Sequence, residues 1–390
     1  MPLGIRKKIK SVAKEAVSAA VSEVKSVAKD VASAAIENIV NRLDKALADI
    51  ENGNLKLLDD TGCRSDSGSD SYSDEEEEDM LSLKLAGVSR YLKLAEIAYK
   101  DESIAENPDF PFVMKSRLVK NVHSSNPIVR YKHHNFLKTD TEVHVCLLHY
   151  GSLAFAFRGT ETTFCNKSVV RDWATDMLKR LVPVIHYNGS DDQVYDGRES
   201  DIKAHKGFLL AFQDVTRTCK PDENIKLVAE GLGAPEEKVR RVICIGHSLG
   251  GALATLCAHW CRRVAYPKAE IYCITIGSPR VGNWSFAKDF KRCVGKDRSF
   301  RLVNKGDIVA QVPIFSILTG YKHVCGRMHL LKDQNREGKI YISRRRIFVK
   351  SLSIRNHFMR SYTKAVQRAL PFLHEDLDRG LPLSTIHTIS

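Results

Sequence analysis

The stretch that decides the fold runs from Arg240 to Trp260 and reads RRVICIGHSLGGALATLCAHW. Its first part is a short β-branched run that stops at Gly246, which is the composition of a buried strand. A segment rich in Gly, Ala and Leu begins at Gly250 and has the apolar spacing of a helix. The chain must therefore turn sharply between a strand and a helix, and Ser248 lies at the tip of that turn.

The spacing around Ser248 has a physical cause. A residue at the tip of such a turn has strained backbone, and the positions two residues before and after it approach each other too closely for side chains. Both positions, Gly246 and Gly250, are glycine. The turn exposes the serine hydroxyl and directs the N–H of Leu249, at the start of a helix, toward a developing oxyanion. The pattern is typical of a nucleophile elbow, and a glycine-rich turn with an idle serine is the alternative.

Two further motifs accompany this segment. FRGTE stands before it at Phe157 to Glu161, and IGSPRVGNWSFA stands after it at Ile276 to Ala287. In this order the three motifs resemble the class 3 lipase family, serine esterases of the α/β-hydrolase fold, over roughly Leu83 to Leu370. The resemblance implies an α/β fold with a mostly parallel central sheet and helices on both faces. It also implies a lipid ester hydrolase that acts on acylglycerols or phospholipids through an acyl-enzyme.

Catalysis by a serine also needs an acid and a histidine, in the order Ser, acid, His for this fold. Asp307 follows a predicted strand, Phe300 to Val303, at the sheet edge where α/β sites form. Among the later histidines, His323 and His329 are alternatives, and we expect His329 to lie in a hairpin. His357, with Tyr362 five residues on, resembles the family's DHxxxxY motif, although the residue before it is Asn instead of the usual Asp. The predicted triad is therefore Ser248, Asp307 and His357.

The resemblance also assigns the oxyanion hole. Predicted strands Val143 to Leu148 and Ser152 to Phe157 lead to Thr160, whose N–H the family pairs with that of Leu249. The chain then departs from the family, because TTFCNKSVVR precedes the Asp172-Trp173 motif and lengthens the region where the family has its lid. A short helix over Arg171 to Leu178 is interpreted as a lid or as a surface helix. His205 is interpreted as structural.

The chain before the resemblance divides into two segments. Residues 1–58 carry apolar residues at helical spacing from Ile5 to Ile50, without Pro or Gly, and predict one long amphipathic helix. Such a helix could lie on a membrane or lipid droplet or form a coiled coil, and a disordered leader is the third alternative. Residues 59–80 include the stretch SDSGSDSYSDEEEED, which predicts a disordered acidic linker. Residues 81–390 are the predicted hydrolase domain, and we leave the oligomeric state open.

Composition limits the partners and the compartment. The net charge of +13 favours an anionic partner, and we expect lipid rather than nucleic acid because no aromatic and basic motif occurs. Many of the ten cysteines fall in predicted strands or in the helix after Ser248, where a free thiol behaves as a small apolar group. No metal-binding spacing stands out, and the expected chemistry requires no cofactor. Without a recognisable signal peptide or membrane span, we expect a cytoplasmic protein, peripheral on membranes or lipid droplets.

Two other functions remain open at this point. The first is a catalytically idle, lipase-like module that binds a membrane or a protein. The complete set of Ser, Asp and His argues against this alternative, because a module without catalytic activity has no need to keep all three. The second is a soluble esterase for small acyl esters, in which the N-terminal helix serves only for oligomerisation.

Overall fold

The structure is a computed structural model that describes residues 89, 91–99, 113–120, 141–148, 151–159, 181–187, 193–198, 200–218, 225–313, 320–332, 340–343 and 353–369. The elements of these residues belong to one compact unit, formed by residues 71–314 and 321–390. Several predictions lie outside the described residues, namely the N-terminal helix, the acidic linker, the helix over residues 171–178, and Thr160.

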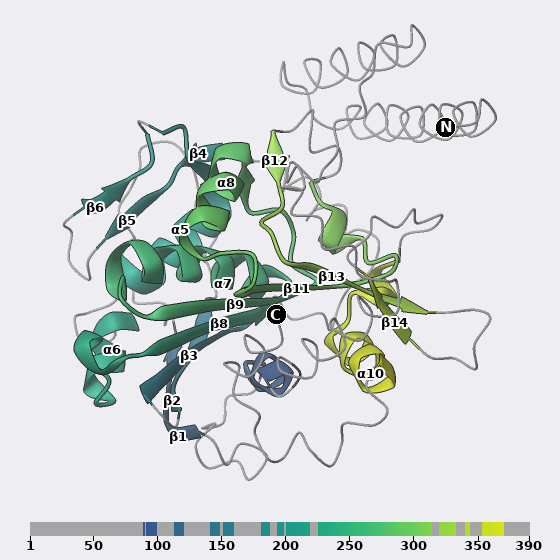
Figure 1. Cartoon of the computed structure of the whole chain (residues 1–390), viewed down its shortest axis with the longest axis horizontal. Coiled ribbons are helices and arrows are strands. Elements are labelled where there is room, and N and C mark those ends of the chain that lie inside the picture. Colours follow the sequence, from purple (N-terminus) through teal and green to yellow (C-terminus); the bar gives the residue numbers. More distant parts are fainter. Residues whose placement is uncertain are drawn as a thin grey trace, which may run out of the picture. The chain divides into compact units, whose positions relative to one another are not determined.

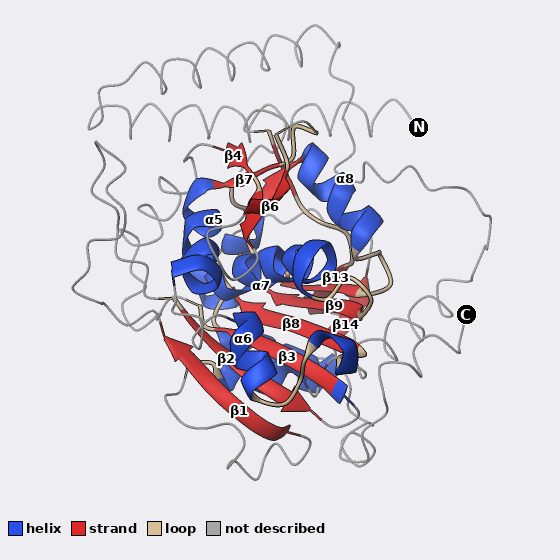
Figure 2. Ribbon diagram, turned by 90° about the vertical axis from the view of Figure 1, so that its left-hand side faces the viewer, coloured by secondary structure: helices blue, strands red, loops and turns tan. Residues whose placement is uncertain are grey.

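An eight-stranded mixed sheet is the framework of the unit (Figures 1 and 2). Its strand order is β1-β2-β3-β8-β9-β11-β13-β14. The bounds are β1 (Val113–Lys120), β2 (Glu142–Leu148), β3 (Ser152–Phe157), β8 (Arg241–His247), β9 (Glu270–Ile276), β11 (Ser299–Asn304), β13 (Arg327–Lys332) and β14 (Ile340–Ser343). The strands from β3 to β13 pair in parallel, whereas β1, β2 and β14 join antiparallel at the two edges. The predicted mostly parallel sheet is confirmed, and the three strands whose bounds were predicted, β2, β3 and β11, agree with the prediction within one residue at each end.

Helices cover both faces of this sheet. The described ones are residues 91–97, α5 (Lys206–Gln213), α6 (Ile225–Gly231), α7 (Leu249–Trp260), α8 (Trp284–Cys293) and α10 (Met359–Ala369). Short helical turns occur at Asp214–Thr218, Glu236–Lys238, Cys261–Ala265, Val309–Gln311 and Ile354–Asn356. A second sheet has the order β12 (Tyr321–Lys322), β10 (Gly282–Asn283), β7 (Lys203–His205) and β4 (Leu181–Pro183), and β5 (Ile185–Tyr187) pairs with β6 (Gln193–Asp196). Figure 1 shows α10 on the side of the main sheet opposite to α7 and α8.

The sheet separates two apolar cores because successive strand residues point to opposite faces. In β8, Val242 and Cys244 pack in the core that α5, α6, α7 and α8 share. Ile243 and Ile245 pack in the other core, with residues 91–98 and α10. Both cores are almost fully buried, and each large apolar side chain in them stabilises the fold by about 1.5–3 kcal/mol. The predicted helices on both faces are therefore confirmed.

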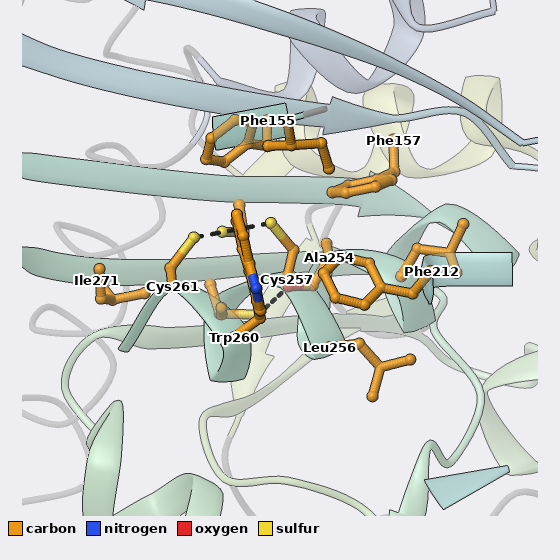
Figure 3. Close-up of a cluster of buried hydrophobic side chains, with 14 of the residues drawn as sticks. Phe155, Phe157, Phe212, Ala254, Leu256, Cys257, Trp260, Cys261 and Ile271 are labelled. Carbon is orange, nitrogen blue, oxygen red and sulfur yellow. Dashed lines mark hydrogen bonds between the residues drawn. The ribbon is translucent and has the colours of Figure 1, made fainter. Parts of the chain in front are cut away.

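Helix α7 is the centre of the first core. Every residue from Gly250 to Trp260 is buried, so the helix is packed on all sides, and its Gly and Ala residues allow neighbouring elements to come close. Figure 3 shows Trp260 with Phe155 and Phe212 in this core. Such a helix cannot shift without opening the core, and it therefore holds the turn at its N-terminus in place.

None of the helices in the described part of the chain is long and apolar enough to cross a membrane.

Candidate active site

The turn between β8 and α7 has the strained geometry that the sequence predicts. Ser248 adopts φ 57° and ψ −126°, in the region that side chains other than glycine rarely enter. A Cβ atom on Gly246 would lie 2.2 Å from the carbonyl oxygen of Gly250, and one on Gly250 would lie 2.3 Å from the carbonyl oxygen of Phe157. Both distances fall below any real Cβ contact. The two glycines are therefore required by backbone approaches on either side of the serine.

Ser248, His357 and Asp307 form one chain of hydrogen bonds. Oγ of Ser248 lies 2.8 Å from Nε2 of His357, and Nδ1 of His357 lies 2.9 Å from Oδ2 of Asp307. All three side chains are buried. Because the ionised carboxylate only accepts, the imidazole proton is on Nδ1, and Nε2 is free to accept the serine proton. The structure brings the three predicted residues together in the arrangement of a nucleophile, a base and an acid.

Asp307 is held through both of its oxygens. Its Oδ1 accepts the backbone N–H groups of Val309 and Ala310, at 2.8 and 3.4 Å, and its Oδ2 accepts the hydroxyl proton of Tyr362 at 2.5 Å. Burial, reinforced by the charge of Asp307, raises the pKa of Tyr362 well above its usual value, so this hydroxyl stays a donor. These three donors hold the carboxylate in one orientation, without contact with water.

His247, which precedes the serine, contacts His357 through a hydrogen bond and a ring stack. Its Nε2 donates to the backbone carbonyl of His357 at 2.7 Å, and the two imidazoles stack with centroids 4.7 Å apart. Its Nδ1 therefore accepts, and the hydroxyl of Tyr99 donates to it at 2.7 Å. Burial, together with the nearby His357, lowers the pKa of His247 to about 3, which keeps this ring neutral. Sequence reasoning did not find this role, although the place of His247 inside the GHSLG motif was a signal.

The residue before His357 is Asn356, where the family has Asp, and the structure gives it a clear task. Its side-chain amide donates to the carbonyl oxygen of Lys305 at 2.9 Å, and its own carbonyl accepts from the amide of Asn304 at 3.0 Å. These bonds join the loop of His357 to the loop that carries Asp307. The substitution therefore leaves the two loops connected.

The other candidate residues are not members of the hydrogen-bonded chain. His323 donates to the carbonyl oxygen of Ala310 at 2.8 Å and takes no part in the hydrogen-bonded chain. His329 lies on β13, which pairs with β14 as the predicted hairpin. His205 caps the N-terminus of α5 through its Nδ1, as its structural interpretation requires. Leu249 is the first residue of α7 and directly follows Ser248.

Comparison with known proteins finds similarity to lipases and phospholipases. The family model described as "Lipase (class 3)" matches residues 154–317. Secreted mono- and diacylglycerol lipase A of Penicillium cyclopium is 29% identical over 215 residues, which cover 55% of this chain and 60% of that protein. The chloroplastic phospholipase A1-Igamma1 of Arabidopsis thaliana is 29% identical over 189 residues, which cover 45% of this chain and 34% of that protein. The chain thus spans at most 60% of the length of these two relatives.

Among solved structures, lipase II from Rhizopus niveus aligns with a TM-score of 0.44 and 21% identity, and the alignment covers 73% of this chain and 94% of that one. The Lip2 lipase from Yarrowia lipolytica aligns with a TM-score of 0.44 and 18% identity, over 77% of this chain and 93% of that one.

Proposed function

We propose that this chain, which belongs to the class 3 lipase family through residues 154–317, hydrolyses carboxylic esters of lipids, either acylglycerols or glycerophospholipids. The observation that carries the proposal is the buried hydrogen-bonded chain from Ser248 through His357 to Asp307. Two of the relatives, a mono- and diacylglycerol lipase and a phospholipase A1, support the two substrate classes by their names.

The geometry supports an acyl-transfer mechanism. The oxygen of Ser248 bonds to the ester carbonyl carbon while Nε2 of His357 takes the hydroxyl proton. The resulting oxyanion accepts hydrogen bonds from the N–H of Leu249 and, as the family resemblance implies, from that of Thr160. The tetrahedral intermediate expels the alcohol, which takes the proton from His357. Water then attacks the acyl-enzyme by the same steps and releases the fatty acid.

Asp307 has a supporting part in each proton transfer. When Nε2 of His357 accepts the proton, the imidazole becomes a cation, and the carboxylate 2.9 Å from Nδ1 stabilises it. The bonds from Tyr362 and from the backbone N–H groups hold that carboxylate in place before the reaction begins.

The first experiment compares the wild type with Ser248→Ala on a dispersed diacylglycerol, a matched phospholipid and a short acyl ester. Ser299→Ala is a suitable control, because Ser299 is also buried and its hydroxyl donates to the carbonyl oxygen of Gly295. We expect Ser248→Ala to lose turnover of every substrate that the wild type hydrolyses, and Ser299→Ala to keep it. If wild type and Ser248→Ala are equally inert on all three substrates, the chain is a lipase-like interaction module instead.

The proposal extends to a lipid interface and to a cytoplasmic location. The predicted N-terminal helix and the basic cluster Arg6, Lys7, Lys8 and Lys10 would dock the enzyme on anionic membranes or lipid droplets. The cysteines in the described part of the chain are all free thiols, which supports a reducing compartment. Flotation of the full chain with anionic and with neutral vesicles tests the docking, and replacement of the four basic residues by Gln is expected to abolish binding to the anionic vesicles. A chain that stays with neither vesicle and sediments as an oligomer would instead favour the coiled coil.

A further inference from the structure

Three buried cysteines lie where the C-terminal end of α7 packs against β8, away from the reacting serine. Cys257 and Cys261 stand one helical turn apart near the end of this helix, and Cys244 lies on β8 and belongs to the same core. Cys257 follows Ser248 by nine positions, which corresponds to roughly 14 Å along the helix axis. The proposed ester hydrolysis makes no use of these thiols.

Three of the sulfur atoms form a compact set. The Sγ atoms of Cys244, Cys257 and Cys261 all lie within 4.8 Å of one another, and those of Cys257 and Cys261 are 3.9 Å apart. Figure 3 shows the last two side chains in the apolar core beside Trp260. A zinc–sulfur bond of about 2.3 Å places two ligand sulfurs about 3.8 Å apart in a tetrahedral site and about 4.0 Å apart in a trigonal one. The observed separation therefore suits a shared cation with little movement of the backbone.

The set is also closed to solvent. Cys244, Cys257 and Cys261 are all fully buried in the core that β8 shares with α7. Structural zinc sites are closed in the same way, because the protein supplies the ligands and no position is left for a substrate.

We propose that Cys244, Cys257 and Cys261 bind a divalent, thiolate-seeking cation, Zn²⁺ in the natural protein. Binding displaces the three thiol protons to solvent and leaves a net charge of −1 on the three-thiolate site. A divalent ion suits this core better than a monovalent one, which would leave a net charge of −2.

The position of the site gives it a structural task. It joins the strand that precedes Ser248 to the end of the helix that follows it, so a bound ion would clamp both arms of the nucleophile turn. A second group, His259, Asp289 and Cys293, has similar separations. There Arg263 and Arg292 already pair with Asp289, and these guanidinium groups take the place of a metal ion.

The test uses the full chain, reduced with a phosphine, and Cd²⁺ as a probe whose thiolate bonds absorb in the ultraviolet. The double variant Cys257→Ala/Cys261→Ala removes two ligands. Cys146→Ala is the matched control, because Cys146 is equally buried but packs in the other core. We expect the wild type and Cys146→Ala to bind one more Cd²⁺ per chain than the double variant, and Zn²⁺ to displace that ion. Zn²⁺ should also raise the thermal midpoint of the first two proteins and not that of the double variant.

Three outcomes would overturn the proposal. The first is equal Cd²⁺ binding by wild type and double variant, and the second is an equal effect of Zn²⁺ on their thermal midpoints. The third is a Cys257–Cys261 disulfide in peptides mapped from the untreated protein, which would make the pair a redox couple. Should the double variant fail to fold, Cys244→Val removes one ligand and keeps the core filled. It should then show the same loss of one bound Cd²⁺ and of the Zn²⁺ effect on the thermal midpoint.

Discussion

Asp307→Asn tests the orientation of the proposed triad, and the structure determines how the new amide would lie. Oδ1 of Asp307 accepts two backbone N–H groups, from Val309 and Ala310. An amide nitrogen in that position would face two donors, at a cost of about 1–3 kcal/mol for each unsatisfied group. The Asn oxygen must therefore stay on the backbone side, and its NH₂ group must point at Nδ1 of His357.

This orientation inverts the tautomer of the imidazole. Nδ1 of His357 would accept from the amide, the ring proton would move to Nε2, and Nε2 could no longer accept the proton of Ser248. The loss of the general base predicts a decrease of kcat by about 10⁴, which corresponds to about 5.4 kcal/mol in activation free energy. The assay is the initial rate on a short acyl ester, with the fold of the variant verified by urea unfolding.

Asp289→Asn is the matched control for this prediction. Asp289 also accepts from a buried histidine, with its Oδ2 2.8 Å from Nε2 of His259, but it lies on α8 and contacts no member of the triad. Its replacement should lower the urea midpoint and leave kcat of the folded protein within about twofold. If Asp307→Asn kept kcat within tenfold of the wild type, or if both variants lost kcat equally, the assignment of Asp307 would be wrong.

Three further predictions concern the elbow, the tyrosine and pH. Gly250→Ala should destabilise the fold by about 3 kcal/mol in urea unfolding, because its Cβ would overlap a backbone carbonyl, whereas Gly231→Ala, with nothing within 4 Å, should not destabilise it. Tyr362→Phe removes the hydroxyl that donates to the carboxylate of Asp307 at 2.5 Å, so it should lower kcat and also lower the free energy of unfolding by about 1.5–3 kcal/mol. Unchanged values of both would show that the backbone N–H groups alone hold the carboxylate in place. Burial lowers the pKa of His186 and His259 in the folded protein, so below about pH 6.5 these histidines bind protons in the unfolded chain before they do so in the folded one. The free energy of unfolding should therefore decrease, by up to about 1.4 kcal/mol per pH unit for each ring, as the pH falls below that value. An equal urea midpoint at pH 7.5 and pH 5.5 would refute this prediction.

Much of the site could be predicted from the sequence because the residues around Ser248 obey local rules. Gly246 and Gly250 are required by backbone contacts within a few residues of the turn or on the adjoining strand, and Asp307 follows a strand whose apolar run is easily recognised. The supporting role of His247 was missed because it depends on the carbonyl of a residue 110 positions away. Spacing along the chain carries no information about such a contact.

The sequence by itself determined the elements and their order. The β-branched run before Gly246, the small residues after it and the strand before Asp307 fixed a strand, a turn, a helix and an acid, since each depends on neighbours in the chain. Only the tertiary structure decided which histidine meets the serine. His323 and His357 both follow Asp307, and the choice between them depends on how the loop of His357 packs against that of Asp307. The cluster of Cys244, Cys257 and Cys261 is likewise tertiary, because a strand and a helix bring its sulfurs together only when the sheet and α7 pack against each other.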